Sequence, residues 1–162
     1  MPQQEIIIEP VIFTDQSHLS QWYMIRSESS VRYGCRSVKK ITPEQHRRWW
    51  QQSMTDIGRL LFFIREYKDQ TEPGRTVGIL RLDDRDGWME VWLAIKPSDR
   101  NRKIATIALA QICERAWKMK WPQLGAIVSG QKNHASWKLF TRAGFIPAAD
   151  GFIKLVQKPR SR

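Results

Sequence analysis

The amino-acid sequence predicts an α/β (α+β) fold in which a mixed, mostly antiparallel sheet of about seven strands carries about four helices on its faces. Three observations predict this class. Strand-like and helix-like segments follow the order β-α-α-β-β-β-α-β-α-β, the last symbol covering two short strands. Asp86-Gly87 is typical of a tight hairpin between antiparallel strands. A strand, a basic loop and a helix then follow in a row, as in a parallel crossover.

The first 58 residues predict one strand and two helices. Residues 5–13 are β-branched and apolar around one Pro, which favours an edge strand or a kinked one. Residues 17–28 carry apolar side chains at helical spacing, and the polar residues after them predict a loop. Thr42, Pro43 and Gln45 form a capping box with Pro at the first helical position, so a second helix begins there.

The rest of the chain predicts the remaining elements. Residues 59–67, 76–82 and 88–96 read as three antiparallel strands. An apolar stripe from Ala105 to Ala116 predicts the third helix. Asn133 and Gly144 are the cap and the end of a fourth helix. The other strands are expected at 124–129, 145–147 and 152–156.

Length and composition predict one domain over residues 1–162. A hydrophobic content of 41% with eight Trp is sufficient for one core, and two domains would each lack apolar residues. A charged content of 27%, without low-complexity segments or repeats, argues against global disorder and solenoid folds. The sequence begins without a signal peptide and holds no stretch of ~18 apolar residues, so we expect a cytoplasmic protein with no membrane partner.

Charge and cysteine content narrow the ligand class. The net charge of +11 favours an anionic ligand, which could be a nucleic acid, a membrane surface, or a phosphorylated cofactor or substrate. Cys35 and Cys113 are far apart in sequence and suggest neither a disulfide framework nor a metal site.

Two motifs lie within residues 88–147. The first is LAIKPSDRNRKIAT, and the second is NHASWKLFTRAGFIP. Together they resemble the motifs of the Gcn5-related N-acetyltransferase (GNAT) superfamily, of which the first is a strand followed by Arg/Gln-x-x-Gly-x-Gly/Ala and a helix. In the second motif, the residues that match in type are Asn133, Ser136, Leu139, Phe140, Gly144 and Phe145. The pair is specific because both motifs fall in the required structural contexts. The resemblance implies a GNAT-type sheet, acetyl-CoA as cofactor, and acetyl transfer to an amine.

The predicted cofactor site has a physical basis of its own. A helix N-terminus offers unpaired N–H groups and about half a positive charge, so it can hold a pyrophosphate. The strand before it can hydrogen-bond the pantetheine arm as another strand would. The predicted cofactor-binding residues are Leu93, Ala94, Ile95, Arg100, Asn101, Arg102, Lys103, Ile104, Ala105, Thr106 and Asn133.

Two residues of this loop depart from the family pattern. The family usually has Gly at the positions of Asn101 and Lys103. If the Lys103 position requires a positive φ, a side chain there costs on the order of 1 kcal/mol of strain. Its positive charge beside a phosphate could offset that cost.

The resemblance also suggests catalytic residues. The attacking amine must be neutral, so a base is needed. Glu90 matches the strand carboxylate that serves as base in many family members; alternatively it is the cross-strand partner of a basic residue such as Arg81. Phe140 occupies the position of the Tyr that usually protonates the leaving thiolate, so water or Ser136 would supply that proton. Asn133 combines a helix cap with an implied contact to the pantetheine or its thiol.

The resemblance places the acceptor on the first two helices, within residues 1–58. Residues 25–50 are similar to nucleotide-amino-sugar acetyltransferases of the pseudaminic acid type. Their basic residues suit a diphosphate, and their aromatic residues suit a base or a sugar. The expected acceptor-binding residues are Arg26, Arg32, Tyr33 and Trp49. Trp49 or Trp50, and His46, have an alternative reading as packing residues.

Other acceptors and one other class of function stay open at this stage. The N-terminal amine of a ribosomal protein is an alternative acceptor, whereas polyamines and aminoglycosides are cationic and disfavoured by a basic pocket. From a different class, the chain could be a non-catalytic basic module that keeps the fold and binds RNA or an acidic partner. The sequence predicts no metal site and leaves a homodimer open.

Overall fold

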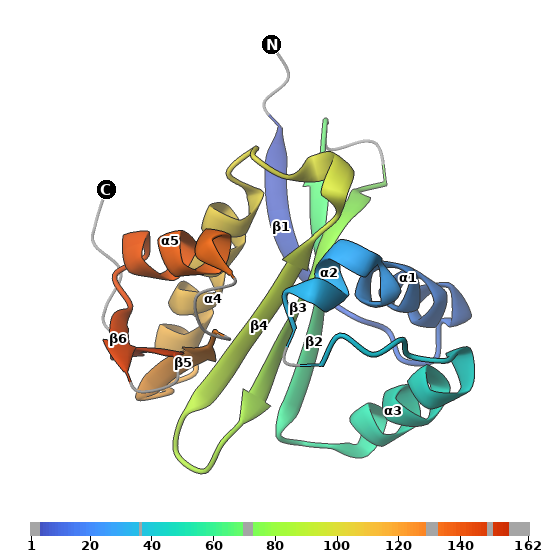
Figure 1. Cartoon of the computed structure of the whole chain (residues 1–162), viewed down its shortest axis with the longest axis horizontal. Helices are drawn as coiled ribbons and strands as arrows, with labels where there is room; N and C mark the ends of the chain where they lie inside the picture. Colours follow the sequence, from blue (N-terminus) through green and yellow to red (C-terminus); the bar gives the residue numbers. More distant parts are fainter. Residues whose placement is uncertain (1–3, 36, 70–72, 129–132, 149–150, 156–162) are drawn as a thin grey trace.

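A sheet of seven strands in the order β1-β2-β3-β4-β5-β7-β6 runs through the computed structural model (Figure 1). The structure describes residues 4–35, 37–69, 73–128, 133–148 and 151–155. Its strands are β1 (Glu5–Pro10), β2 (Arg59–Tyr67), β3 (Arg75–Asp84), β4 (Met89–Ile95), β5 (Gln123–Ile127), β6 (Ile146–Ala148) and β7 (Gly151–Leu155). The predicted fold class is confirmed. The expected strand ends at Ser129 and Val156 lie outside the described residues.

The sheet is antiparallel except at one junction. Strands β1 to β4 pair in antiparallel succession, and so do β5, β7 and β6. Strands β4 and β5 are parallel, and the chain crosses between them through helix α4 (Ile104–Lys118). The predicted single parallel crossover is therefore present, and it divides an antiparallel N-terminal part from a smaller C-terminal part.

Five α-helices form in the described residues where about four were expected. The other four are α1 (Gln16–Ser27), α2 (Ser29–Tyr33), α3 (Pro43–Thr55) and α5 (His134–Arg142), and a 3-10 turn η1 (Pro97–Asp99) follows β4. The additional helix is α2, in a segment predicted as loop. The Glu28 carboxylate accepts hydrogen bonds from the backbone N–H groups of Ser30 and Val31, which starts the helix, and buried Val31 holds it against the sheet. The predicted capping box of α3 is present.

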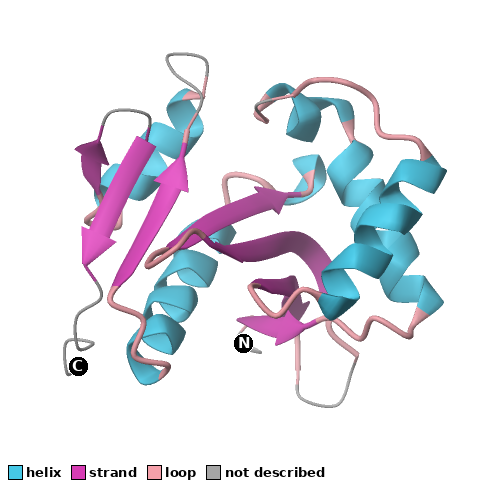
Figure 2. Cartoon of the chain, turned by 90° about the horizontal axis from the view of Figure 1, so that it is seen from below, coloured by secondary structure: helices cyan, strands magenta, loops and turns pink. Residues whose placement is uncertain are grey.

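The helices form two layers on opposite faces of the sheet (Figures 1 and 2). Alternate residues of β2 point to opposite faces, as strand geometry requires. Phe62 and Ile64 pack with α4 in one core, whereas Leu61 and Phe63 pack with α1 and α3 in the other. The two cores keep both faces of β3 and β4 covered, and the junction of β4 and β5 lies between the two helix layers.

A close approach of β3 and β4 determines where the loop after β4 starts. A Cβ at Gly78 would lie 2.6 Å from the carbonyl oxygen of Ala94, so only glycine fits at that position. The β2–β3 register shifts beside it, and the Lys96 N–H donates to the Val77 carbonyl at 2.9 Å. The end of β4 is thus held against β3 just before η1.

Candidate active site

A cleft opens where β4 and β5 separate. In the described part of the chain, the parallel register between the two strands is limited to Met89 with Leu124 and Glu90 with Gly125. Beyond these pairs lies a cleft of about 800 Å³, lined by residues 91–95 of β4 and by Ile127 and Val128. The predicted cofactor residues Leu93, Ala94 and Ile95 therefore line an edge of β4 that can pair with an extended ligand.

The loop and the first turn of α4 form one end of this cleft. The residues that line it there are Asp99, Arg100, Asn101, Lys103, Ile104, Ala105 and Thr106. Lys103 is the N-cap of α4, and its side chain makes no capping hydrogen bond. The first N–H groups of the helix therefore have no capping partner from that side chain, which is the arrangement that favours an anion.

Asn101 and Lys103 both adopt the left-handed backbone conformation, each with φ of 61°. The condition under which a side chain at Lys103 costs strain is therefore met. Asn tolerates this conformation, whereas Lys pays on the order of 1 kcal/mol. The loop therefore keeps a backbone that normally favours glycine although neither residue is one.

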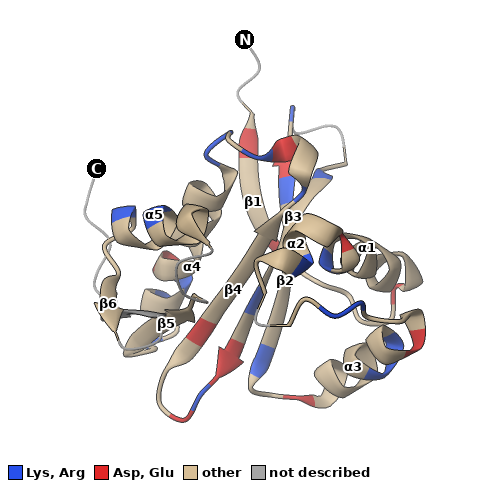
Figure 3. Ribbon diagram, in the orientation of Figure 1, with Lys and Arg blue, Asp and Glu red and all other residues tan. Residues whose placement is uncertain are grey.

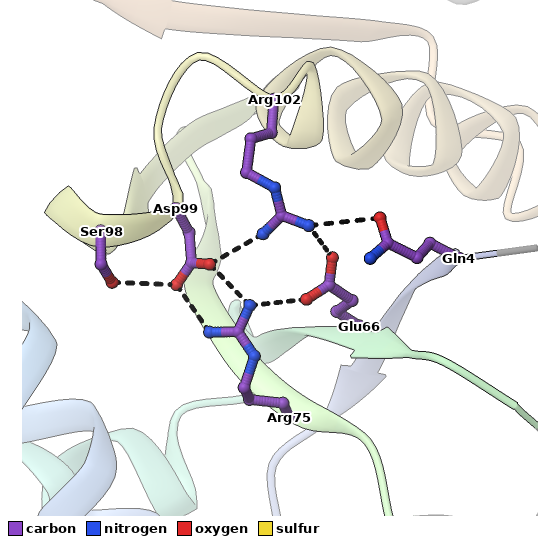
Figure 4. Close-up of polar contacts among 6 residues, drawn as sticks. All are labelled: Gln4, Glu66, Arg75, Ser98, Asp99 and Arg102. Carbon is purple, nitrogen blue, oxygen red and sulfur yellow. Dashed lines mark hydrogen bonds and ion pairs between the residues drawn. The ribbon is translucent and has the colours of Figure 1, made fainter.

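The two arginines of the loop point in different directions. The Arg100 guanidinium lines the cleft, donating to the Ile95 carbonyl at 3.2 Å and to Ser30 Oγ of α2 at 2.8 Å. Arg102 does not line the cleft. Its guanidinium bonds Asp99 at 2.8 Å and also bonds Glu66 of β2 (Figure 4). The structure thus departs from the expectation that Arg102 adds its charge to the pyrophosphate site.

Helix α5 supplies the other wall of the cleft. Asn133 Oδ1 accepts from the Ser136 N–H at 3.1 Å, as the predicted cap requires, and Asn133 Nδ2 donates to the Gly34 carbonyl at 3.5 Å. Asn133, Ser136 and Phe140 all line the cleft. The Phe140 ring packs edge-on against Phe145 at 5.1 Å between centroids. The structure therefore brings the second motif to the cleft together with the first.

Glu90 lies at the point where β4 and β5 separate, but it does not line the cleft. Its carboxylate is buried, and Oε2 accepts from Arg85 Nε at 2.6 Å. Glu90 thus has a basic partner, as the alternative expected, but this partner is Arg85 of the hairpin connection and not a residue opposite it on β3. Arg81 instead pairs with Asp83, which also contacts Arg59 and Arg85.

Acidic and basic positions gather at the hairpin end of β2, β3 and β4 (Figure 3). We call Arg26, Arg59, Arg81, Asp83, Arg85 and Glu90 the hairpin cluster. The guanidinium carbons of Arg26 and Arg81 lie 5.6 and 5.4 Å from the centroid of Trp92. Burial lowers the pKa of Arg81. Because Trp92 lines the cleft, the hairpin cluster adjoins it.

The other predicted acceptor residues, Trp49, Tyr33 and Arg32, lie in three different surroundings. Trp49 stacks on His46 at 5.6 Å and meets the Arg59 guanidinium at 5.4 Å, so it adjoins the hairpin cluster. Tyr33 is 67% exposed and lines the cleft from α2. Arg32, in contrast, donates to the carbonyls of Ser27 and Val38. Arg32 thus ties α2 to the end of α1 and to the segment after α2.

The alternative interpretation of His46 and Trp50 as packing residues agrees with the structure. Both are buried, His46 Nε2 lies 3.1 Å from the Leu19 carbonyl, and Trp50 Nε1 donates to the Phe13 carbonyl. Burial lowers the pKa of His46. Of the other basic residues before α3, Lys39 and Lys40 are exposed, and Arg36 lies outside the described residues.

Sequence reasoning missed Trp92 and Arg81 as parts of the site. The signal was available in the sequence. Trp92 and Glu90 are two residues apart and therefore lie on the same face of β4. A two-residue hairpin at Asp86-Gly87 also places Arg81 opposite Trp92. Within the residues that the structure describes, no group of three or more His, Cys, Asp or Glu could hold a metal ion. The same residues include no helix long and apolar enough to cross a membrane.

Comparisons with known proteins point to one family. Residues 6–146 match the family model of the acetyltransferase (GNAT) domain. The sequence has no match among curated proteins. A domain from Methanocaldococcus jannaschii has a similar structure, with a TM-score of 0.82 and 17% identity over 94% of this chain and 99% of that one. Spermidine N-acetyltransferase from Vibrio cholerae, solved with CoA and spermine, is similar with a TM-score of 0.81 and 9% identity, over 93% of this chain and 95% of that one. An aminoglycoside acetyltransferase in complex with coenzyme A is similar with a TM-score of 0.75 and 10% identity, over 93% of this chain and 95% of that one.

Proposed function

This chain belongs to the GNAT acetyltransferase family, and we propose that it acetylates a primary amine on an anionic acceptor, a nucleotide-linked amino sugar. Family membership makes it an acetyl-CoA-dependent N-acetyltransferase. The acceptor and the role of each residue are the proposal. The observation that carries it is the cleft between β4 and β5, which has a helix N-terminus at one end and adjoins an arginine-rich cluster beside Trp92.

Two polar features of the cleft, the N-terminus of α4 and the exposed edge of β4, suit acetyl-CoA. The backbone N–H groups of residues 101–106 would hold the pyrophosphate, with charge added by Arg100 and Lys103. The exposed edge of β4 at residues 93–95 would hydrogen-bond the pantetheine arm, because β5 no longer pairs with it there. When bound, acetyl-CoA supplies the thioester whose acetyl group is transferred. Small Ala105, half-buried in the first turn of α4, allows close approach.

Glu90 is proposed as the base that takes the proton of the acceptor ammonium, through a water. Glu90 is buried and belongs to the last β4–β5 pair, so it is next in the strand to Val91, the first residue of β4 that lines the cleft. Arg85 Nε lies 2.6 Å from Glu90 Oε2 and orients the carboxylate. The Ser136 hydroxyl or water is proposed to return a proton to the CoA sulfur, and Asn133 to orient the pantetheine from the opposite wall.

Arginines beside the cleft support an anionic acceptor. Arg26 and Arg81 both lie at the ring of Trp92, which lines the cleft, and Arg26 Nη1 is buried without a hydrogen-bond partner in the described structure. Guanidinium groups beside the cleft attract a phosphate or carboxylate and disfavour a polyamine. Trp49 and Trp92 could stack on a base or a sugar. The likeness to the spermidine and aminoglycoside enzymes, at 9% and 10% identity, extends to the fold alone.

An acceptor panel tests this proposal. Purified protein with acetyl-CoA would be assayed by CoA release against UDP-linked amino sugars, spermidine, an aminoglycoside, and peptides with free N-termini. We expect kcat/KM for a UDP-linked amino sugar to exceed that for every cationic acceptor by at least tenfold. Faster acetylation of spermidine or of a peptide would overturn the choice of acceptor while leaving the family intact.

A further inference from the structure

A second group of charged residues ties the loop after β4 to strands β2 and β3 (Figure 4). It consists of Glu66 on β2, Arg75 at the start of β3, Asp99 in η1 and Arg102 before α4, and we call it the anchor cluster. Glu66 and Asp99 are 3% and 2% exposed. Asp99 also contributes to the lining of the cleft, so the anchor cluster reaches from the sheet to the cleft.

The contacts within the anchor cluster form a closed ring. Arg75 donates to Asp99 Oδ2 at 2.9 Å, to Asp99 Oδ1 at 2.6 Å and to Glu66 Oε2 at 2.6 Å. Arg102 donates to Asp99 Oδ1 at 2.8 Å and to Glu66 Oε1. Ser98 Oγ also bonds Asp99, and Gln4 bonds Arg102. Every carboxylate oxygen has a donor, and two acids balance two guanidiniums.

This ring holds a loop whose backbone conformation is unfavourable by itself. Residues 97–103 contain no glycine. Arg102 stands between Asn101 and Lys103, the two residues with left-handed backbone. Without an external constraint, a non-glycine residue leaves this conformation readily. Arg102 and Asp99 are tied to β2 and β3, and these ties constrain the loop from both of its ends.

We propose that the anchor cluster positions the acetyl-CoA site by holding residues 100–103 in the conformation that directs their amides into the cleft. Its residues are positioning residues that act through the loop backbone. The inference rests on the proposed role of that loop and assigns Arg102 a function other than binding phosphate. A pre-formed loop binds its ligand more tightly because the ligand does not have to order it.

One substitution separates this role from simple electrostatics, because the two explanations predict opposite changes in the Kd of acetyl-CoA. Asp99→Asn removes a negative charge near the phosphate site and releases Arg102. If charge alone mattered, the variant would bind acetyl-CoA more tightly. If the anchor cluster positions the loop, we expect the Kd of acetyl-CoA, measured by calorimetry well below the unfolding temperature, to rise at least tenfold, with kcat at saturating acetyl-CoA within twofold of wild type.

Two further variants complete the test. Glu9→Gln breaks the ion pair with Arg65 between β1 and β2 and should leave the Kd unchanged. Adding Asn101→Gly to Asp99→Asn should recover at least threefold of the lost affinity, because glycine adopts positive φ without constraint. If Asp99→Asn does not fold, Glu66→Gln takes its place with the same expected weakening.

The outcomes distinguish this inference from the function on which it rests. If wild-type protein does not bind acetyl-CoA, the proposed cofactor site fails. If wild type binds and Asp99→Asn binds equally well or more tightly, the positioning role is overturned and the site stands. Weaker binding without recovery by Asn101→Gly would also overturn the backbone mechanism.

Discussion

Two clusters of charged side chains lie at opposite ends of β3, and they differ in how completely their polar groups are paired. The anchor cluster has two acids and two arginines, with a donor for each carboxylate oxygen. In the hairpin cluster, Arg26 Nη1 is buried without a hydrogen bond among the described residues, and Arg26 and Arg81 both lie at the ring of Trp92. A fully paired ring suits a structural support, whereas an unpaired guanidinium group beside a cleft suits an anionic ligand.

The largest effect is expected from Glu90→Gln in the hairpin cluster. Removing the base should lower kcat by about a hundredfold near neutral pH, within the usual range for general-base catalysis. The defect should shrink as pH rises, because more of the acceptor amine is then already neutral. Turnover measured across pH checks this, with Glu114→Gln on the exposed side of α4 as the control. Unchanged turnover at low pH would remove Glu90 from the catalytic machinery.

Arg26→Gln tests the unpaired guanidinium group of the same cluster. We expect about a tenfold rise in the KM of a UDP-linked amino sugar, with the KM of acetyl-CoA unchanged, since Arg26 contacts Trp92 and does not itself line the cleft. Arg48→Gln removes the same charge from an exposed position on α3 and should change neither constant. Equal effects from both variants would mean that only net charge matters.

The anchor cluster should make the stability of the folded protein sensitive to acid. Burial alone would raise the pKa of Glu66, but hydrogen bonds and charges from Arg102 and Arg75 lower it overall, and hydrogen bonds from Arg75 lower the pKa of Asp99. Groups with lowered pKa stabilise the fold above their unfolded pKa, near 4, and lose that contribution as pH falls through the folded value. Urea unfolding from pH 7 to pH 3 should show the loss below about pH 4, and Glu66→Gln should flatten it. An equally steep loss in Glu66→Gln would place the acid sensitivity elsewhere.

The smallest effect concerns backbone strain at Lys103. Lys103→Asn should stabilise the protein by about 0.5 kcal/mol, because Asn tolerates positive φ better than Lys. Acetyl-CoA should nevertheless bind severalfold more weakly, because a charge beside the phosphates is lost. Thermal unfolding and calorimetry together check the two opposite signs. A destabilised variant would show that the left-handed conformation at this position carries no strain.

Local signals predicted much of this protein, and distant contacts account for what they missed. The capping box at Thr42, the hairpin at Asp86-Gly87 and the helix after Lys103 are encoded within a few residues, so the fold and most of the cleft followed from sequence. The direction of Arg102 depends on Glu66, which is 36 positions away along the chain. No local pattern contains that pairing.

The pairings at the hairpin end were missed for a different reason. A two-residue turn at Asp86-Gly87 places Asp83 opposite Glu90 and Arg81 opposite Trp92. Counting outward from the turn would have shown that Trp92 meets Arg81. Helix α2 was missed because a Glu is an unusual cap and five residues are too few for a helical period to show.

Acetyl-CoA binding to the wild-type protein tests the central claim most directly, since the loop, the cleft and the anchor cluster all depend on it. A ligand at a hundred times its Kd stabilises a folded protein by about 2.7 kcal/mol. For a domain of this size that corresponds to a rise in Tm of roughly 5–10 °C. We predict such a rise with acetyl-CoA and a much smaller one with Ala105→Leu, which fills the approach to α4. No rise in Tm at millimolar acetyl-CoA would contradict the account.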